Sequence, residues 1–283
     1  SRDDASIISA FNEAWNEDAL LALKALFYFR DVRGGQGERN TFRVITKWLA
    51  ETYPTQMKAN LHLIAEYGRW DDLYTFVGTE LERDVWNIVD VQLAQDMQAE
   101  RPSLLAKWLK SENASSKTTK ALAKKTRKAL EMSPKRYRKM LSELRAKIDL
   151  VEQHISAKDW SGIDYSKIPS KAGLQYRKAF WRNDEERYGA FLEDVANGDA
   201  KINAGTLYPY EIVEKTKGHG WHYAGDVSAA ETRTLDAMWN NLPDYFDGTE
   251  TRGLVVADVS GSMSGRPMDV SISLAIYTAE RNK

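Results

Sequence analysis

Residues 20–49 read LLALKALFYFRDVRGGQGERNTFRVITKWL, which is two apolar runs separated by a glycine-rich break. Apolar residues recur every three to four positions in both runs, at Leu20, Leu23, Leu26 and Phe27 and then at Phe42, Ile45, Trp48 and Leu49. This spacing is typical of amphipathic helices, and Asn40 is a residue type that often caps one. The stretch therefore predicts two helices joined by a short loop.

The same helical pattern extends to about residue 200. It recurs near Leu61, near Leu73 and from Val85 to Leu93, with Asp71 as a candidate cap and short breaks between the runs. Helices of this length, joined by short loops, pack as successive antiparallel pairs. We therefore expect a mainly α fold built as a HEAT-like helical-repeat array, for which a closed ring is one arrangement, although the sequence has no fixed repeat period.

The pattern changes near residue 198, where glycines and scattered aromatic residues replace the helical spacing. We predict a helical-repeat domain over 1–197, a connecting segment with one helix over 198–252, and a separate α/β piece over 253–283. In this last piece LVVADV (254–259) is a short, Val-rich apolar run typical of a buried strand. A helix follows, with an apolar stripe suited to packing on a sheet, formed by Met268, Ile272, Ala275, Ile276 and Ala279.

Composition excludes several classes of protein. The chain has no Cys, which rules out disulfides and thiolate chemistry. No segment approaches the roughly eighteen consecutive apolar residues of a membrane helix, so we expect no membrane span. The first residues are acidic and polar where a signal peptide is basic and then apolar, so we expect a cytoplasmic protein.

Charge is distributed unevenly along the chain. The net charge is only −1, yet residues 117–147 hold twelve Lys/Arg and two Glu, a local balance of +10. We call residues 117–147 the basic segment. A concentrated excess of this kind favours a localised anionic partner.

The basic segment is predicted to form two helices, since Ser133 suits a helix cap and Pro134 a first helical position. Its cations can meet successive phosphates, and its tyrosine can stack on an unpaired base. The predicted nucleic-acid contacts are Lys120, Lys124, Lys125, Arg127, Lys128, Lys135, Arg136, Tyr137, Arg138 and Lys139. Two other interpretations stay open: a solvated charged face, and a surface that docks another protein.

A metal motif follows the predicted strand, where Asp258, Ser260 and Ser262 form a DxSxS pattern in a tight loop. At the carboxyl edge of a sheet these side chains can converge on Mg²⁺ or Mn²⁺, which prefer hard oxygen ligands. Three ligands leave positions for waters and an incoming carboxylate, so the site is incomplete by itself. The alternative is a plain strand-to-helix turn in which serine acts as a cap.

The break RGGQG (33–37) allows a phosphate-loop interpretation because glycine amides can hold an anion. It lacks the Lys-Ser/Thr that follows a P-loop. A structural interpretation is favoured, in which the glycines end one helix and Asn40 starts the next. The neighbouring arginines, Arg30, Arg33 and Arg39, would then pair with Asp31 and Glu38.

Catalytic signals are weak. His219 and His222 share a glycine-rich stretch, but no third ligand is spaced for zinc. No motif typical of a nucleophile or of an acid–base pair stands out. We therefore do not expect an enzyme.

Residues 256–265, VADVSGSMSG, resemble the metal-ion-dependent adhesion site (MIDAS) of von Willebrand factor A domains. The resemblance implies that 253–283 is the first strand, loop and helix of such an α/β domain. It also implies that a Thr and a second Asp from later loops complete the site, and that the ion binds an acidic protein ligand.

Five other stretches resemble a family of unknown function from bacteria, phages and plants, whose members place a helical region before a von Willebrand A module. They are LFYFRDVRGGQGERNTF (26–42), EYGRWDDL (66–73), SPKRYRKMLSELR (133–145), DWSGIDYSKIPSKAG (159–173) and LYPYEIV (207–213). That architecture is similar to the Ro-type (TROVE) RNA-binding proteins, in which a ring of helical repeats binds small RNAs.

The resemblance implies a non-enzymatic scaffold, part of a ribonucleoprotein, that binds small structured or single-stranded RNA. A second class of function stays open: a protein-interaction or phage virion-associated assembly module with no nucleic-acid role. A nuclease using Asp258 and Mg²⁺ is less favoured, because no second carboxylate or base accompanies the motif.

Overall fold

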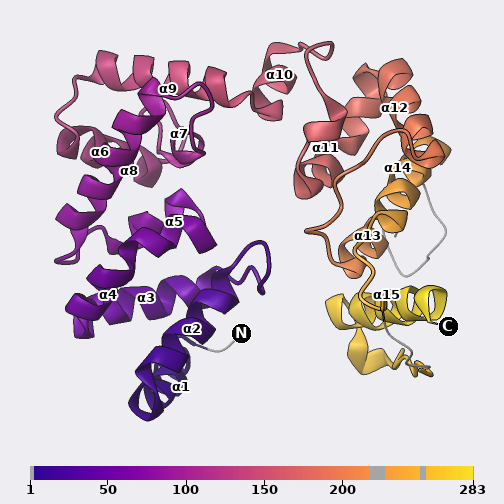
Figure 1. The fold of residues 1–283 in the computed structure, drawn as a ribbon, viewed down its shortest axis with the longest axis horizontal. Coiled ribbons are helices and arrows are strands. Elements are labelled where there is room, and N and C mark those ends of the chain that lie inside the picture. Colours follow the sequence, from indigo (N-terminus) through magenta and orange to yellow (C-terminus); the bar gives the residue numbers. More distant parts are fainter. Residues whose placement is uncertain (1–2, 217–226, 249–252, 283) are drawn as a thin grey trace. The chain divides into compact units, whose positions relative to one another are not determined.

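The computed structural model describes residues 3–216, 227–248 and 253–282. All regular structure in these residues is helical, as Figure 1 shows, so the predicted mainly α class is confirmed. The chain divides into two compact units, Ser1–Leu150 and Val151–Lys283. The predicted boundaries at 197/198 and 252/253 both lie inside the second unit and stay predictions.

The first unit is a series of helices around one apolar core. In chain order they are α1 (Asp4–Glu17), α2 (Ala19–Arg30), α3 (Asn40–Thr52), α4 (Pro54–Asn60), η1 (Leu61–Leu63), α5 (Ile64–Tyr67), η2 (Trp70–Phe76), α6 (Glu82–Gln98), α7 (Leu105–Trp108), α8 (Lys117–Ala129) and α9 (Pro134–Ile148). Helix α1 packs on α2 and α3, and α7 packs on α9. These neighbouring pairs are consistent with a helical-repeat array.

Local sequence signals explain where these helices begin. The Asp18 side chain accepts the Leu21 backbone N–H at 2.9 Å and caps α2. The core is built from the apolar positions that the spacing indicated, such as Leu26 and Phe42 with 2% and 1% of their surface exposed. Caps therefore set where these helices begin, and burial of one apolar face sets which side of each helix packs into the core.

The second unit has its own core. Its helices are α10 (Val151–Ala157), η3 (Tyr165–Lys167), α11 (Ser170–Asn183), α12 (Glu185–Asn197), α13 (Pro209–Thr216), α14 (Ala229–Asn240), η4 (Gly261–Met263) and α15 (Arg266–Arg281). Tyr165, Phe180 and Tyr188 form an aromatic cluster with ring centroids 4.8 to 5.3 Å apart. Helices α11, α12 and α14 pack around this cluster, and α15 packs on α13.

The predicted strand at 254–259 is not formed. A strand is stabilised by hydrogen bonds to a neighbouring strand, and the described residues contain none. The apolar run lies at the surface instead, with 92% of Leu254 and 88% of Val256 exposed.

Helix α15 uses a different face from the one we predicted. Its buried residues are Asp269, Ser273 and Tyr277, which lie four residues apart and face the rest of the second unit. The predicted apolar stripe is only partly buried: Met268, Ile272 and Ala275 are partly covered, whereas Ala279 is exposed and Ile276 is 44% exposed. The stripe therefore has no sheet to pack on in the described part of the chain.

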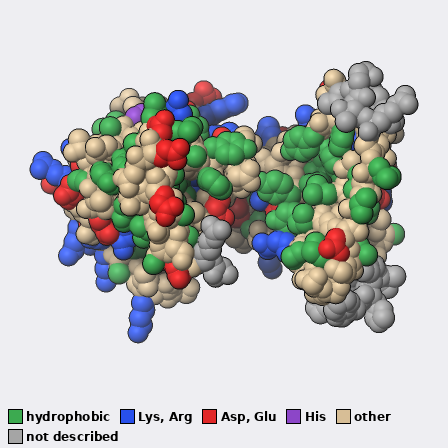
Figure 2. Space-filling model, turned by 90° about the horizontal axis from the view of Figure 1, so that it is seen from below, with side chains coloured by type: hydrophobic (Ala, Val, Ile, Leu, Met, Phe, Trp, Pro, Cys, Tyr) green, Lys and Arg blue, Asp and Glu red, His purple; other side chains and the backbone are tan. Residues whose placement is uncertain are grey.

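Large hydrophobic side chains are exposed in both units (Figure 2). None of the described helices combines the length and the apolar character that crossing a membrane requires.

Candidate nucleic-acid interface and metal loop

The basic segment folds into the two predicted helices, α8 and α9. Ser116 Oγ accepts the Thr119 backbone N–H at 3.3 Å, and Ser133 Oγ accepts that of Arg136 at 3.2 Å. Pro134 occupies the first turn of α9, as predicted. The two caps fix where these helices begin. Both helices belong to the first unit.

Most of the predicted contact residues are exposed. They are Lys120, Lys124, Lys125, Lys128, Lys135, Arg136, Arg138 and Lys139. Lys125 Nζ lies 2.7 Å from Glu82 Oε2, and Lys139 Nζ lies 3.6 Å from Glu143 Oε1. In the parts of the chain that the structure describes, the other six make no ion pair. Their charge is thus available to an external anion.

Arg127 is committed to the fold. Its Nε donates to Glu112 Oε1 at 2.8 Å, and its Nη1 donates to the Met132 carbonyl oxygen, also at 2.8 Å. The side chain is only 16% exposed. Arg127 therefore fixes the turn between α8 and α9 instead of facing a ligand.

Tyr137 contradicts the predicted stacking role. The residue is fully buried, and its hydroxyl donates to the Lys110 carbonyl oxygen at 2.8 Å. Burial raises the pKa of this hydroxyl above its ordinary value. Tyr137 lies on the same face of α9 as Met140 and Leu144, at the i, i+3 and i+7 positions of a buried stripe. This helical spacing was visible in the sequence, but the charged neighbours of Tyr137 obscured it.

The buried face of α8 does not coincide with the apolar residues of this helix. Ala123 and Thr126 are buried, whereas Ala129 is exposed. Thr126 Oγ1 lies 3.1 Å from the Tyr74 hydroxyl, which satisfies a polar group inside the packing surface.

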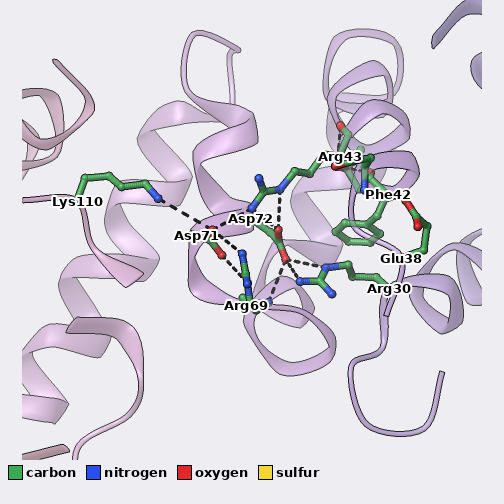
Figure 3. Close-up of polar contacts among 10 residues, drawn as sticks. Arg30, Glu38, Phe42, Arg43, Arg69, Asp71, Asp72 and Lys110 are labelled. Atoms are coloured by element: carbon green, nitrogen blue, oxygen red, sulfur yellow. Dashed lines mark hydrogen bonds and ion pairs between the residues drawn. The ribbon is translucent and has the colours of Figure 1, made fainter. Parts of the chain in front are cut away.

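Two of the quoted motifs meet in a buried charge network (Figure 3). Asp72 on η2 accepts the Arg30 Nε–H at 2.8 Å, and Arg30 Nη2 forms an ion pair with the same oxygen at 2.8 Å. Arg43 on α3 donates to the other Asp72 oxygen at 2.7 Å. The side chains of Arg30 and Asp72 are 2% and 1% exposed. Paired charges of this kind are costly to separate once buried.

Asp71 extends the network toward solvent. It accepts two hydrogen bonds of 2.9 Å from Arg69, and Lys110 Nζ approaches to 4.0 Å from the other side (Figure 3). Burial raises the pKa of Asp71, but Arg69 and Arg43 outweigh it and hold the pKa below its ordinary value. Asp71 and Asp72 thus anchor positive charges from three segments of the first unit.

The partners that we predicted for the arginines around RGGQG are wrong. Arg30 pairs with Asp72, and Arg33 donates from its side chain to the Glu66 carbonyl oxygen at 2.7 Å. The position of the helix start is correct, because α3 begins at Asn40. Glu38 supplies the cap, accepting the backbone N–H of Asn40 at 2.9 Å.

The glycines of this break serve packing. A Cβ on Gly35 would lie 1.9 Å from the Tyr28 carbonyl oxygen, so only glycine allows the loop to approach the end of α2. This favours the structural interpretation of the break over a phosphate loop.

The DxSxS loop brings its three side chains together. Asp258 Oδ1 accepts the Ser260 backbone N–H at 2.9 Å, and Ser260 Oγ lies 3.0 Å from Ser262 Oγ. The Ser260 amide holds the pKa of Asp258 below its ordinary value, so the carboxylate is charged near neutrality. Three hard oxygen donors on one loop fit a partial Mg²⁺ or Mn²⁺ site.

No group of three or more His, Cys, Asp or Glu in the described residues is arranged to hold a metal ion. A cation at the DxSxS loop would be held by one carboxylate and two hydroxyls, as predicted for an incomplete site. His219 and His222 lie outside the described residues.

Residues 1–131 and 102–247 match the family described as "Domain of unknown function (DUF2828)". The chain belongs to this family. The two matched stretches overlap over 102–131, which includes α8 of this DUF2828 chain. The DxSxS loop lies outside the matched residues.

A relative from Acanthamoeba polyphaga mimivirus, called "Uncharacterized protein L728", is 29% identical over 312 residues. The match covers 96% of this DUF2828 chain and 53% of the relative, so the chain spans about half the length of that protein. No solved structure matches the chain. Neither of these two names states a ligand or an activity.

Proposed function

We propose that this chain is a non-enzymatic scaffold, similar in kind to Ro-type proteins, that binds small structured or single-stranded RNA along α8 and α9. The supporting observation is the set of six exposed cations on these two consecutive helices that have no carboxylate partner among the described residues. Cations held on a rigid helix neutralise successive phosphates and release counterions, which favours binding.

The competing interpretation of a solvated charged face is less favoured by the pattern of ion pairs. A face that balanced acidic residues elsewhere in the fold would pair with them. Only Lys125, Arg127 and Lys139 of the predicted contacts do so within the described residues. In the described part of the chain the other six cations are exposed without such a partner, which is costly through mutual repulsion unless an external anion compensates.

The experiment compares two variants with equal change in net charge. The test variant is Lys120→Glu, Lys124→Glu, Lys128→Glu and Arg136→Glu together. The control reverses four exposed cations outside the basic segment, Lys24, Lys47, Arg182 and Lys201. RNA affinity is measured by fluorescence anisotropy across a range of salt concentrations.

The test variant is expected to lose most of its affinity, and the slope of log K against log salt is expected to fall by roughly 3 units, given about 0.7 per lost phosphate contact. The control should bind RNA nearly as tightly as wild type. Equal losses in both variants would point to a general effect of net charge and would remove the proposal.

We further propose that residues 253–283 are the first part of a von Willebrand A module that holds Mg²⁺ for an acidic protein ligand. Two observations support this. Hydrogen bonds link Asp258, Ser260 and Ser262 within one loop, and the run 254–259 and Ile276 of α15 are exposed, as they would be without the rest of a sheet.

The metal proposal is tested with Mn²⁺ as the probe, followed by electron paramagnetic resonance. Wild type is expected to reduce the signal of free Mn²⁺, and Asp258→Ala to abolish that effect. Asp247→Ala, which removes an exposed carboxylate outside the loop, should behave as wild type. Identical Mn²⁺ binding by all three proteins would exclude a site at the loop.

An assembly module without a nucleic-acid role is the second candidate, whether protein-binding or virion-associated. The exposed apolar side chains of Leu254, Val256 and Ile276 favour it, because such surfaces often mark protein contacts. Under this alternative, the purified protein would show no nuclease-sensitive absorbance at 260 nm. Partner binding would be abolished by EDTA and by Asp258→Ala.

A further inference from the structure

A polar pocket opens in the first unit between the loop after α7 and the helix α9. It has a volume of about 330 Å³, and its polar lining consists of Ser111, Asn113, Arg138, Lys139, Ser142 and Arg145. Each of these side chains offers a hydrogen-bond donor, and none is a carboxylate. The pocket is therefore suited to an acceptor-rich, negatively charged group.

Arg145 gives the pocket a fixed positive charge. Its Nε donates to the Ala106 carbonyl oxygen at 2.8 Å, and its Nη2 donates to that of Leu109 at 2.9 Å. These bonds hold the guanidinium in one orientation and leave other N–H donors for a ligand. Arg145 is half-buried, and burial lowers its pKa.

Within the part of the chain that the structure describes, no carboxylate pairs with Arg145. A partly desolvated cation without a counter-charge is unfavourable, and an anion in the pocket would relieve that cost. Among the described residues, the one ion pair at the pocket is the exposed pair between Lys139 and Glu143, with N and O 3.6 Å apart. Exposed pairs of this kind contribute little and are easily exchanged for a better acceptor.

The pocket continues the exposed face of α9. Arg138, Ser142 and Arg145 lie at i, i+4 and i+7, so they share one side of the helix, with Lys135 one turn before them. The spacing from Lys135 to Arg145 is about 15 Å along the axis, given 1.5 Å per residue. A chain of phosphates bound along α9 would therefore pass the pocket.

We infer that this pocket binds a phosphate group, which forked donors from Arg and hydroxyl donors from Ser recognise well. The assignment of that phosphate to an RNA backbone rests on the proposed function, whereas the binding of phosphate itself does not. The two sources, RNA and free phosphate, are separated by the experiment.

Ser142 provides a matched pair of variants because it is exposed and its replacement leaves the core intact. Ser142→Asp places a carboxylate beside Arg138 and Arg145 that competes with phosphate. Ser142→Asn is nearly isosteric with that variant, stays neutral and keeps a donor. Circular dichroism confirms that both variants fold, which avoids reliance on an Arg145 variant whose carbonyl contacts support α7.

In the first arm, inorganic phosphate is titrated into each full chain and followed by amide chemical shifts. Wild type and Ser142→Asn are expected to show saturable shifts at α9 and residues 111–113, and Ser142→Asp is expected to show none. Equal shifts in all three proteins, or no shifts in wild type, would overturn the proposal that the pocket binds phosphate.

In the second arm, single-stranded RNA is titrated by fluorescence anisotropy. If the phosphate belongs to RNA, Ser142→Asp is expected to bind at least about tenfold more weakly than Ser142→Asn, as follows from the loss of one charge-assisted contact of about 1.5 kcal/mol. Loss of phosphate binding without any change in RNA affinity would support the pocket and reject RNA as the source. RNA binding that fails in wild type, with phosphate binding retained, would reject only the proposed function.

Discussion

Arg30 and Asp72 form a buried, hydrogen-bonded ion pair across 42 residues of sequence. The pair connects the end of α2 with η2, and through Arg43 it also holds α3 (Figure 3). Because Asp72 also accepts the Arg69 backbone N–H at 3.0 Å, a single carboxylate joins α2, α3 and the start of η2. The stability of the first unit therefore depends strongly on the Asp72 side chain.

Asp72→Asn is expected to destabilise the first unit by about 3–5 kcal/mol, since it leaves Arg30 buried without a counter-charge. Urea unfolding followed by circular dichroism measures the loss. The more exposed pair Lys58–Asp84, 2.8 Å apart and with 59% and 27% of the side chains exposed, supplies the control. Asp84→Asn should lower the unfolding free energy by less than about 1 kcal/mol. Equal losses in the two variants would show that burial does not determine how much an ion pair contributes to stability.

Asp71 is expected to make stability sensitive to acid. Its pKa is lowered in the folded state, so the unfolded chain binds its proton first as pH falls. Its stabilisation is full above about pH 4, the ordinary pKa of Asp, and is lost as pH falls through the lower folded value. The difference in unfolding free energy between wild type and Asp71→Asn should narrow over that range. A constant difference down to the acid unfolding limit would contradict this assignment.

Gly68→Ala is expected to disrupt the same network. A Cβ there would lie 2.6 Å from Asp72 Oδ2 and 2.9 Å from the Ile64 carbonyl oxygen. The backbone oxygen cannot move freely, so the expected loss is about 1–3 kcal/mol in unfolding free energy. Gly205 has open space around it and an ordinary backbone. Gly205→Ala should stay within about 0.5 kcal/mol of wild type.

Tyr137→Phe is expected to lower stability by about 1 kcal/mol through loss of the hydrogen bond to the Lys110 carbonyl oxygen. RNA affinity should not change, because the ring is buried in both proteins. Anisotropy and urea unfolding on the same samples separate the two effects. A weaker RNA complex with unchanged stability would restore the stacking role.

Local signals in the sequence predicted local structure well. The apolar spacing around Leu26 and Phe42 predicted α2 and α3, and the pair Ser133-Pro134 predicted the start of α9, because caps and periodicity act within one turn. The exposed cations of the basic segment were also found, since a charged helix face needs no distant partner.

Features that depend on distant residues were missed. Nothing near Arg30 in the sequence indicates Asp72, so the prediction pairs the arginines of this stretch with the nearby Asp31 and Glu38. The run 254–259 has the composition of a buried strand, but a strand forms only where another strand pairs with it. Arg145 was not recognised as a site residue, because its role depends on two carbonyl oxygens at the end of α7.

The basic segment concentrates a local charge of +10 on α8 and α9, although the net charge of the molecule is only −1. An approaching polyanion would exert a torque on such a molecule before any contact forms and would turn these helices toward itself. Retention on a cation exchanger near neutral pH would accordingly exceed what an isoelectric point of about 6.5 suggests.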